Sequence, residues 1–598
     1  MRKIFPILLI ILIMVLVITK PWEVEGVVEG QVTSSKKFIS TNEHNRTVEL
    51  EVGLNSEEEM LWRYLDEGSG FLPLNFFYAL KDHKTGKPFI EVLPRFGFVP
   101  SPSNSSNLPI GLTTGQLSAA QSNSLYLGTN CAVCHSGMYT YQGTAMVIDG
   151  APNILDFEAF FNELEKSFLK TVSSPSKLYQ LIHDLMKREH NPDKEGELFE
   201  VHPSVLQVFS DMHTATDGQA LAATKKNIES GLHKAYQSKP EQGKNILEKL
   251  ANEITLPTSS AYNWSEERLH YLKKSISNFH KDIAFIKEHI NRLSKVKKSF
   301  IGETVAGPGR ADSFDAIWDL LVQKNQLIPM AAPVSIPQLF NYNQFKWVHW
   351  DGNTSSILER DYAQAIALGA SYNPDNSESS VLPLNIMNLE LVARKIRVPK
   401  WPNKILGSID LEKAARGKAI FSKNCLSCHA EESLTPVAEV GTDPQRAVNF
   451  ARLEHDGKSY ATILAELGRK VVEVSLKSHN IDTTNLTPIK HSKSSAWRVT
   501  NAYHSRPLDG IWASPPYLHN GSVPTLWDLL TPASERPKEF LVGRELDPIK
   551  VGINSITQTG DEWVFKVEET GNSNQGHEFG VEMSDEEKWS LIEYLKTL

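Results

Sequence analysis

The chain begins with one long apolar run. Arg2 and Lys3 make a basic start, positions 4–18 are apolar apart from a single proline, and Lys20 follows soon after. A basic start and about fifteen apolar residues are typical of a secretory signal, and the run is shorter than the roughly 20 residues of a transmembrane helix. Because no Ala-x-Ala cleavage site follows, residues 1–26 are predicted to be a signal peptide or, favoured here, an uncleaved anchor. Either places the body of the chain in the periplasm or another extracytoplasmic space, and an anchor would hold it at the inner membrane.

A second apolar pattern lies between residues 166 and 300, which are rich in Lys and Glu. Apolar residues recur there at alternating spacings of three and four, at Leu269, Leu272, Ile276, Phe279, Ile283, Ile286, Ile290 and Leu293. This spacing predicts a helix with one apolar stripe, either in a short coiled-coil seam or lying singly on a core. The segment is interpreted as a helical insertion, and its histidines as solvated.

Two shorter amphipathic helices are predicted near the C-terminus. One, at 415–421, carries Gly417 and Phe421 on the same face. The other begins at a capping box, Ser584 with Glu587, and runs to the end of the chain.

These patterns divide the chain into five parts: 1–26, signal peptide or anchor; 27–165, an N-terminal haem domain; 166–300, the helical insertion; 301–400, a loop-rich segment completing the N-terminal haem domain; and 401–598, a C-terminal cytochrome c domain.

Composition adds two constraints. The chain has 598 residues, too many for one compact core, and its 40% hydrophobic and 22% charged residues are those of an ordinary globular protein. A net charge of −9 without long basic runs gives no reason to expect nucleic-acid binding. There are only four cysteines, and all four lie in two Cys-x-x-Cys-His pentads, so none remains for a structural disulfide.

The two pentads predict covalent haem attachment. We refer to Cys131–His135 as the N-terminal pentad and to Cys425–His429 as the C-terminal pentad. Two cysteines three residues apart reach the two vinyl groups of one haem, and the following histidine is placed to bind the iron. Cys131, Cys134 and His135 are therefore assigned to one haem c, and Cys425, Cys428 and His429 to a second.

The four cysteines have two other interpretations. A four-cysteine zinc site made from both pairs would have to close across 294 residues (425 − 131), and it leaves the histidine after each pair unexplained. A redox-active pair of the thioredoxin type would lack its βαβ context. Both are less consistent with the sequence than haem.

Several strings outside the pentads resemble the di-haem cytochrome c peroxidase superfamily and, within it, the rubber-oxygenase-like branch. The likeness covers about 60% of the chain, residues 95–165 and 300–598. It is carried by GPGRAD (307–312), HWDGNT (349–354), PPYLHNGSVPTL (515–526), which is typical of the superfamily, and GNSNQGH (571–577), which is typical of the branch. The helices around the C-terminal pentad resemble the crossed N- and C-terminal helices of class I cytochromes c. The resemblance implies a mainly α protein with two such haem domains, long loop-rich connections and a helical insertion.

The resemblance also implies roles for single residues. His577 corresponds to a late histidine that binds the C-terminal haem iron, the alternative being a hydrogen-bonded loop histidine. Ala533 and Ser534 stand where di-haem peroxidases have a methionine ligand. Peroxide reduction is the reaction that the superfamily implies and oxygenation of a hydrophobic organic compound the one that the branch implies, and the missing methionine modestly favours oxygenation. No side-chain ligand is expected opposite His135. Phe314 is expected to line a dry distal pocket and Arg310 to pair with a haem propionate, each with a plain structural alternative. His519 is expected to be a pocket residue or, alternatively, a ligand of the C-terminal haem. Trp347 and Trp350 are candidates for a place between the haems, or for ordinary core positions.

The function implied is that of a di-haem oxidoreductase. One haem, with an open position, would act on peroxide or dioxygen, and the other would transfer electrons to or from a small redox protein or a quinol-linked partner. The alternative is an electron-transfer cytochrome with both haems six-coordinate; a maturation enzyme for another protein is a third hypothesis. A fold resemblance does not identify the substrate.

Overall fold

The computed structural model describes residues 46–101, 108–116, 125–172, 177, 304–311, 332–431, 433–481, 496–555 and 563–598. The predicted signal or anchor, Phe314 and nearly all of the helical insertion lie outside these residues. Within the described residues, no helix has both the length and the apolar character that crossing a membrane requires.

The prediction of a mainly α fold is wrong. Of the described residues, 39% are helical and 19% lie in strands, which form many small sheets. The reason is visible in β5 (Ser136–Tyr141) and β6 (Thr144–Asp149), the longest strands in the part of the chain that the structure describes. Nearly every residue of both is buried, whichever face it lies on. Strands covered on both faces lack the polar–apolar alternation that marks a strand in a sequence.

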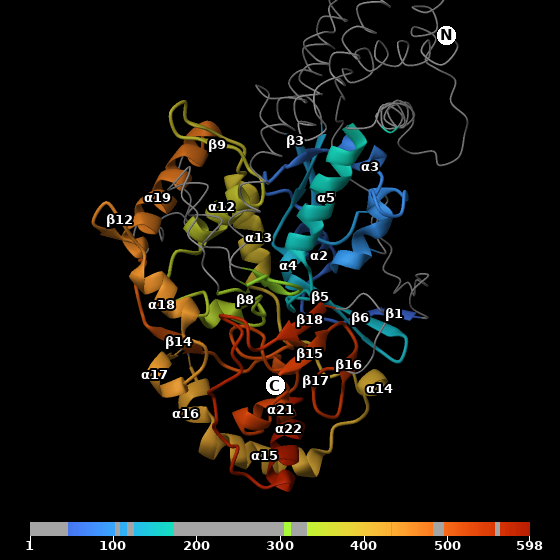
Figure 1. Ribbon diagram of the computed structural model, residues 1–598, viewed down its shortest axis with the longest axis vertical. Coiled ribbons are helices and arrows are strands. Elements are labelled where there is room, and N and C mark those ends of the chain that lie inside the picture. Colours follow the sequence, from blue (N-terminus) through green and yellow to red (C-terminus); the bar gives the residue numbers. More distant parts are fainter. Residues whose placement is uncertain are drawn as a thin grey trace, which may run out of the picture.

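Two three-stranded sheets form the N-terminal part, drawn from blue to cyan in Figure 1. In one, β6 pairs with β5 and with β1 (Arg46–Glu49). In the other, β4 (Leu125–Thr129) pairs with β2 (Leu72–Pro73) and β3 (Leu112–Gln116). The N-terminal pentad follows β4 and forms the short helix α4 (Ala132–His135), directly before β5. Along the chain it therefore connects a strand of one sheet to a strand of the other. The helices around it are α2 (Ser56–Tyr64), α3 (Leu74–Ala79), α5 (Phe157–Val172) and the 3-10 helix η1 (Phe89–Phe96).

A group of three helices, yellow to orange in Figure 1, lies beside the N-terminal part. It consists of α12 (Ile357–Ala367), α13 (Pro383–Ala393) and α19 (Tyr460–Ser478). Helix α13 packs against α2, and α19 lies on the far side of the group. Helix α19 packs closely on α12, because at Gly468 even a Cβ atom would lie 2.9 Å from the Cβ of Glu359.

The two predicted C-terminal helices are confirmed. They are α15 (Leu411–Asn424) and α22 (Asp585–Leu595), and they pack against each other. A Cβ atom at Gly417 would lie 1.9 Å from the backbone oxygen of Ser590, so only glycine permits this crossing. Phe421 contacts Tyr594, with ring centres 5.4 Å apart. The capping box of Ser584 and Glu587 is present as predicted.

The remaining elements are short. Between the N-terminal part and α15 lie β7 (Arg310–Ala311), β8 (Val334–Ser335), η5 (Tyr342–Gln344), β9 (Tyr372–Asn373), β10 (Glu378–Ser379) and α14 (Asn403–Leu406). After α15 come α16 (Leu426–His429), β11 (Ser433–Pro436), α17 (Val437–Val440), α18 (Gln445–Arg452), β12 (Glu454–His455), β13 (Lys458–Ser459), β14 (Ala502–Ser505), η8 (Ile511–Ala513), α21 (Leu526–Leu529), η9 (Ala533–Glu535), β15 (Glu539–Val542), β16 (Leu546–Asp547), β17 (Gly552–Ile553) and β18 (Trp563–Lys566). The predicted division after residue 165 falls inside α5, which continues across it.

Candidate functional site

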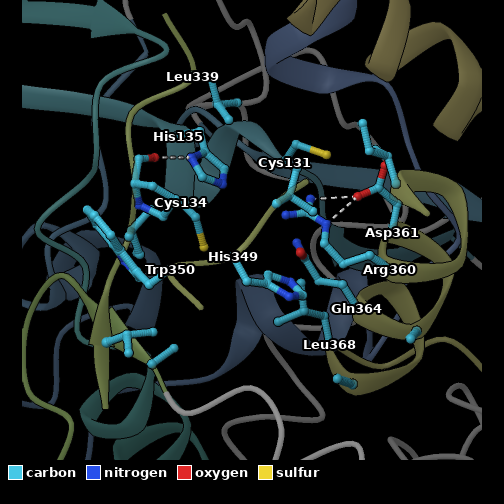
Figure 2. Close-up of a pocket in the computed structure, with 18 of the residues that line it drawn as sticks. Cys131, Cys134, His135, Leu339, His349, Trp350, Arg360, Asp361, Gln364 and Leu368 are labelled. Carbon is cyan, nitrogen blue, oxygen red and sulfur yellow. Dashed lines mark hydrogen bonds and ion pairs between the residues drawn. The ribbon is translucent and has the colours of Figure 1, made fainter. Parts of the chain in front are cut away.

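A large cavity lies beside the N-terminal pentad. Both cysteines and His135 line it, together with residues of α12, α19 and the chain from 334 to 350. The free space among the lining atoms, its opening to solvent included, is about 2180 Å³, and apolar surface predominates in the lining. Figure 2 shows the two sulfur atoms and the His135 ring directed into the same space. Two thiols and an imidazole converging on one roomy cavity are the donor set that covalently bound haem requires.

His135 is oriented by a backbone carbonyl. Its Nδ1 lies 3.0 Å from the oxygen of Pro337, which can only accept, so Nδ1 carries the proton and Nε2 has the lone pair. Burial lowers the pKa of this histidine to about 3, with a smaller contribution from Arg360. A neutral imidazole with a hydrogen-bonded Nδ1 is the usual form of a histidine that binds a metal. His135 therefore fits the role of an iron ligand.

A buried network fixes the backbone next to His135. The hydroxyl of Ser136 donates to Asp149, at 2.6 Å, and accepts from the indole N–H of Trp62, at 3.0 Å. Arg63 in turn forms a buried ion pair with Asp149, at 2.9 Å. These contacts tie the end of α4 to β6 and α2, so the imidazole has a rigid support.

His349 lines the same cavity, and its tautomer is also fixed. The Nδ2 of Asn353 donates to Asp351 at 2.9 Å, which leaves Oδ1 of that amide to accept from Nδ1 of His349 at 2.7 Å. The proton is therefore on Nδ1, and Nε2 is the acceptor. Burial lowers the pKa of His349 to about 3, and Arg360 and Arg446 lower it further. Figure 2 shows its ring inside the cavity, below the cysteine sulfurs.

Helix α12 adds polar side chains to this wall. Arg360 forms an ion pair with Asp361, with Nη2 and Oδ1 2.6 Å apart, and Gln364 lies one turn further along the helix. Figure 2 shows Arg360 and Gln364 reaching into the cavity near Cys131 and His349. Burial lowers the pKa of Arg360, but the attraction of Asp361 outweighs it, so the pKa lies above its ordinary value. The guanidinium group is therefore charged.

The C-terminal pentad is nearer to the surface. No residue of α16 is fully buried, whereas Ala132, Val133 and His135 are buried in α4. His429 is nonetheless oriented as His135 is, because its Nδ1 lies 2.7 Å from the backbone oxygen of Arg506. Burial lowers the pKa of His429, which keeps the ring neutral.

His577 faces His429 at the distance expected of two ligands to one metal ion. Metal–imidazole bonds are about 2 Å long and each ring centre lies about 1.1 Å behind its nitrogen, so opposed ligands have ring centres about 6.2 Å apart. The ring centres of His429 and His577 are 6.3 Å apart. Burial, and next His429, lowers the pKa of His577 to about 4. Its buried Nδ1 has no hydrogen-bond partner on another described residue. The pair fits a haem iron between the two rings.

The loop that carries His577 is held by a buried arginine. The guanidinium of Arg536 donates to the backbone oxygens of Asn574 (2.6 Å), Gly576 (2.8 Å) and His577 (3.3 Å), and also to two oxygens of the α21 region. Gly576 has φ +76°, and a Cβ there would lie 2.2 Å from the carbonyl carbon of Gly441. The string GNSNQGH thus has a physical function, which is to set His577 against His429.

The other predicted site residues lie as follows. Arg310 lines the cavity, but its guanidinium donates to the backbone oxygens of Val305, Ala306 and Asn520 and to Oδ1 of Asn572. His519 is buried and stacks on Tyr503, with ring centres 4.0 Å apart. It is not among the described residues that line the cavity. Catalytic roles for Arg310, His519 and Phe314 stay predictions.

Four further residues of the site were not identified from the sequence: His349, Arg360, Gln364 and Arg506. His349 lies in the HWDGNT string, so a histidine four residues before an asparagine was an available signal. Arg360 and Gln364 lie on α12, and nothing in the sequence distinguishes them from polar residues on the surface of a helix. Arg506 acts partly through its backbone, which leaves no sequence signal.

Comparison with known proteins supports a cytochrome c. Residues 502–541 match the model of a family described as RoxA-like, cytochrome c-like. This match supports a relation to the RoxA-like cytochromes c and, through them, to haem-dependent oxidoreductases; it does not by itself support the wider assignment to the di-haem peroxidases. Haem c is the cofactor implied.

Two similar proteins come from Sinorhizobium fredii. The uncharacterised protein y4iJ is 27% identical over 588 residues, covering 86% of this chain and 86% of that protein. The uncharacterised protein y4iM is 27% identical over 333 residues, covering 48% of this chain and 71% of that protein. The name of neither protein states a function.

Proposed function

We propose that this protein is an exported oxidoreductase with two covalently bound haems c, one at each pentad. The N-terminal site acts on hydrogen peroxide or dioxygen, and the C-terminal site passes electrons. When bound, haem supplies an iron that exchanges electrons and, where one position is open, binds a small oxygen ligand. Cys131 and Cys134 would hold one haem with His135 as ligand, and Cys425 and Cys428 the other with His429 and His577.

The observation that carries this proposal is the polar wall opposite His135. Peroxide reduction, H₂O₂ + 2 e⁻ + 2 H⁺ → 2 H₂O, needs a base that takes a proton from one oxygen and returns it to the other. Nε2 of His349 is an acceptor held in place by Asn353, so it can do this. Arg360 is charged and can donate to an oxygen that gains negative charge. Between the two reactions expected, this wall favours peroxide over the oxygenation of an apolar compound.

The different burial of the two pentads supports the division of labour. The C-terminal pentad lies near the surface, where a small redox protein or a quinol-linked partner can approach, and His429 and His577 would both hold its iron. The N-terminal pentad lies deep, beside the cavity. Electrons would enter at the exposed site and be used at the enclosed one. The apolar run at 4–18 is the support for export and for an anchor at the inner membrane.

A second candidate function also depends on His349. If His349 binds the iron opposite His135, both haems are six-coordinate and the protein is an electron-transfer cytochrome. The two proposals differ in the spin state of the oxidised protein and in its response to external ligands. An open site gives a high-spin component that cyanide converts to low spin, and a closed site does not.

The deciding experiment compares the purified full chain with His349→Ala and with a matched control, His455→Ala, whose histidine is partly exposed on β12. Haem content, spin state and the rate of peroxide consumption are measured on each. We expect two haems per chain, a high-spin component in the unchanged protein, and a rate lowered by about 10²–10⁴ in His349→Ala only, which is the usual contribution of a general base. A purely low-spin protein in which His349→Ala creates the high-spin signal would exclude the catalytic proposal in favour of the second.

A further inference from the structure

The two histidines of the pentads are held by carbonyls that lie close together in the fold. Nδ1 of His135 is bonded to the oxygen of Pro337 and Nδ1 of His429 to the oxygen of Arg506. Pro337 is followed by Gln338, a residue that is only 7% exposed. A contact between Arg506 and Gln338, the residue after Pro337, would therefore connect the two backbone segments that orient His135 and His429.

The side chain of Arg506 makes that link. Its Nη2 donates to the backbone oxygen of Gln338, 3.2 Å away. Its guanidinium carbon lies 4.4 Å from the ring centre of Phe345 and 6.0 Å from that of Trp350, and the residue lines the cavity of the N-terminal pentad. One residue thus contacts His429 through its backbone and the support of His135 through its side chain.

We propose that Arg506 is the bridge for electron transfer between the two haem sites. The path runs from His429 through the backbone and side chain of Arg506 to Gln338, along the peptide to Pro337, and on to His135. Every step is a covalent bond or one of three hydrogen bonds, of 2.7, 3.2 and 3.0 Å. One electron crosses, so the centre at His429 is oxidised by one unit, the centre at His135 is reduced by one, and no proton moves. This inference rests on the proposed function, since it requires a haem at both pentads.

A second route competes with this one. Nε1 of Trp350 donates to the backbone oxygen of Ser335, at 2.7 Å, and the backbone carbonyl of Trp350 accepts from the N–H of His504, also at 2.7 Å. His504 pairs with Leu434 in the strand after the C-terminal pentad. This route, however, does not touch the Nδ1 atom of either pentad histidine. The Arg506 route does so at both ends.

The test is the rate of electron transfer between the haems, measured by rapid photoreduction of the full two-haem protein without peroxide. Arg506→Met removes the guanidinium but leaves the backbone carbonyl that supports His429. Arg506→Lys, which keeps the charge, is the second variant in case the first folds poorly. Trp350→Phe tests the other route. Arg397→Met is the matched control, because this arginine also donates to backbone carbonyls, those of Arg394 and Ile396, but does not line the cavity.

We expect slower transfer in both Arg506 variants, with unchanged rates in Arg397→Met and unchanged electron paramagnetic resonance signals of the His429 centre. An unchanged rate in Arg506→Met, or slowing only in Trp350→Phe, would overturn the proposal. The proposal would also be overturned if the electron paramagnetic resonance signal of the His429 centre changed together with the rate, since the arginine would then only position that ligand. Haem content is measured on the same samples: a chain with one haem refutes the proposed function, whereas two haems with an unaffected rate refute the bridge alone.

Discussion

Replacing His577 tests the geometry of the C-terminal site most directly. The ring centres of His429 and His577 are 6.3 Å apart. Subtracting about 1.1 Å for each ring leaves a gap of about 4 Å between the facing nitrogens, which is twice the length of one metal–imidazole bond. An alanine at 577 cannot cross this gap, and the loop cannot move inward, because Arg536 holds three of its carbonyls.

The expected result of His577→Ala is therefore a new open position at one haem and no change at the other. In reduced protein, carbon monoxide binding should rise from about one to about two molecules per chain, because a five-coordinate haem iron takes up such a ligand. Added imidazole should restore the low-spin spectrum. The control is His479→Ala, which removes the side chain of the residue that follows α19 as its C-cap. An unchanged stoichiometry in His577→Ala would refute the assignment of His577 as the second ligand of His429.

Three further predictions concern the residues that support the sites. Arg536→Met leaves five backbone oxygens without their charged donor, so it should destabilise the protein by at least about 3 kcal/mol in denaturant titrations and broaden the low-spin signal of the His429 centre. Gly417→Ala should lower the free energy of unfolding by about 1–3 kcal/mol, because its Cβ would meet the Ser590 carbonyl, whereas Lys418→Ala on the exposed face should change it by less than about 0.5 kcal/mol. Burial lowers the pKa of His519 to about 3, so as the pH falls below about 6.5 the histidine is protonated in the unfolded chain before it is protonated in the folded one. The stability that the neutral histidine contributes is therefore complete above about pH 6.5 and is lost below it, by about 2–3 kcal/mol at pH 4.5. His519→Gln should remove this share of the acid sensitivity.

Each of these three predictions has an outcome that would contradict it. Equal unfolding midpoints for Arg536→Met and the unchanged protein would show that the loop carrying His577 does not depend on the hydrogen bonds of Arg536. Gly417→Ala as stable as Lys418→Ala would mean that α15 and α22 can move apart at no cost. An unchanged slope of stability against pH in His519→Gln would mean that another group accounts for the acid sensitivity.

The local chemistry of this protein could be predicted from its sequence, because it depends on residues close together in the chain. The helix pair of α15 and α22 was found in this way, from glycine spacing and a capping box. The pentads and the late histidine likewise gave predictions that the geometry fits. His577 was placed through the string around it, whose glycine and asparagine residues now have a visible role in holding the loop.

The rest depends on contacts between distant residues. The carbonyl that orients His135 is 202 residues away, and the one that orients His429 is 77 residues away. Any residue can supply a backbone carbonyl, so no residue type marks these positions. The strands β5 and β6 were missed because burial on both faces removes the polar positions that would have revealed them.

The walls of the cavity have a consequence for how the protein is made. The cysteines at 131 and 134 line a space whose other sides come from residues as late as Arg506, 375 positions (506 − 131) further along the chain. Burial raises the pKa of both thiols, Cys134 to about 12, which suppresses the reactive thiolate once the walls are closed. If haem is held at these cysteines as proposed, it would therefore be attached while the C-terminal half is still open, and the chain would then fold around it. Attachment at the N-terminal pentad and the closing of the cavity would then follow one another in a fixed order.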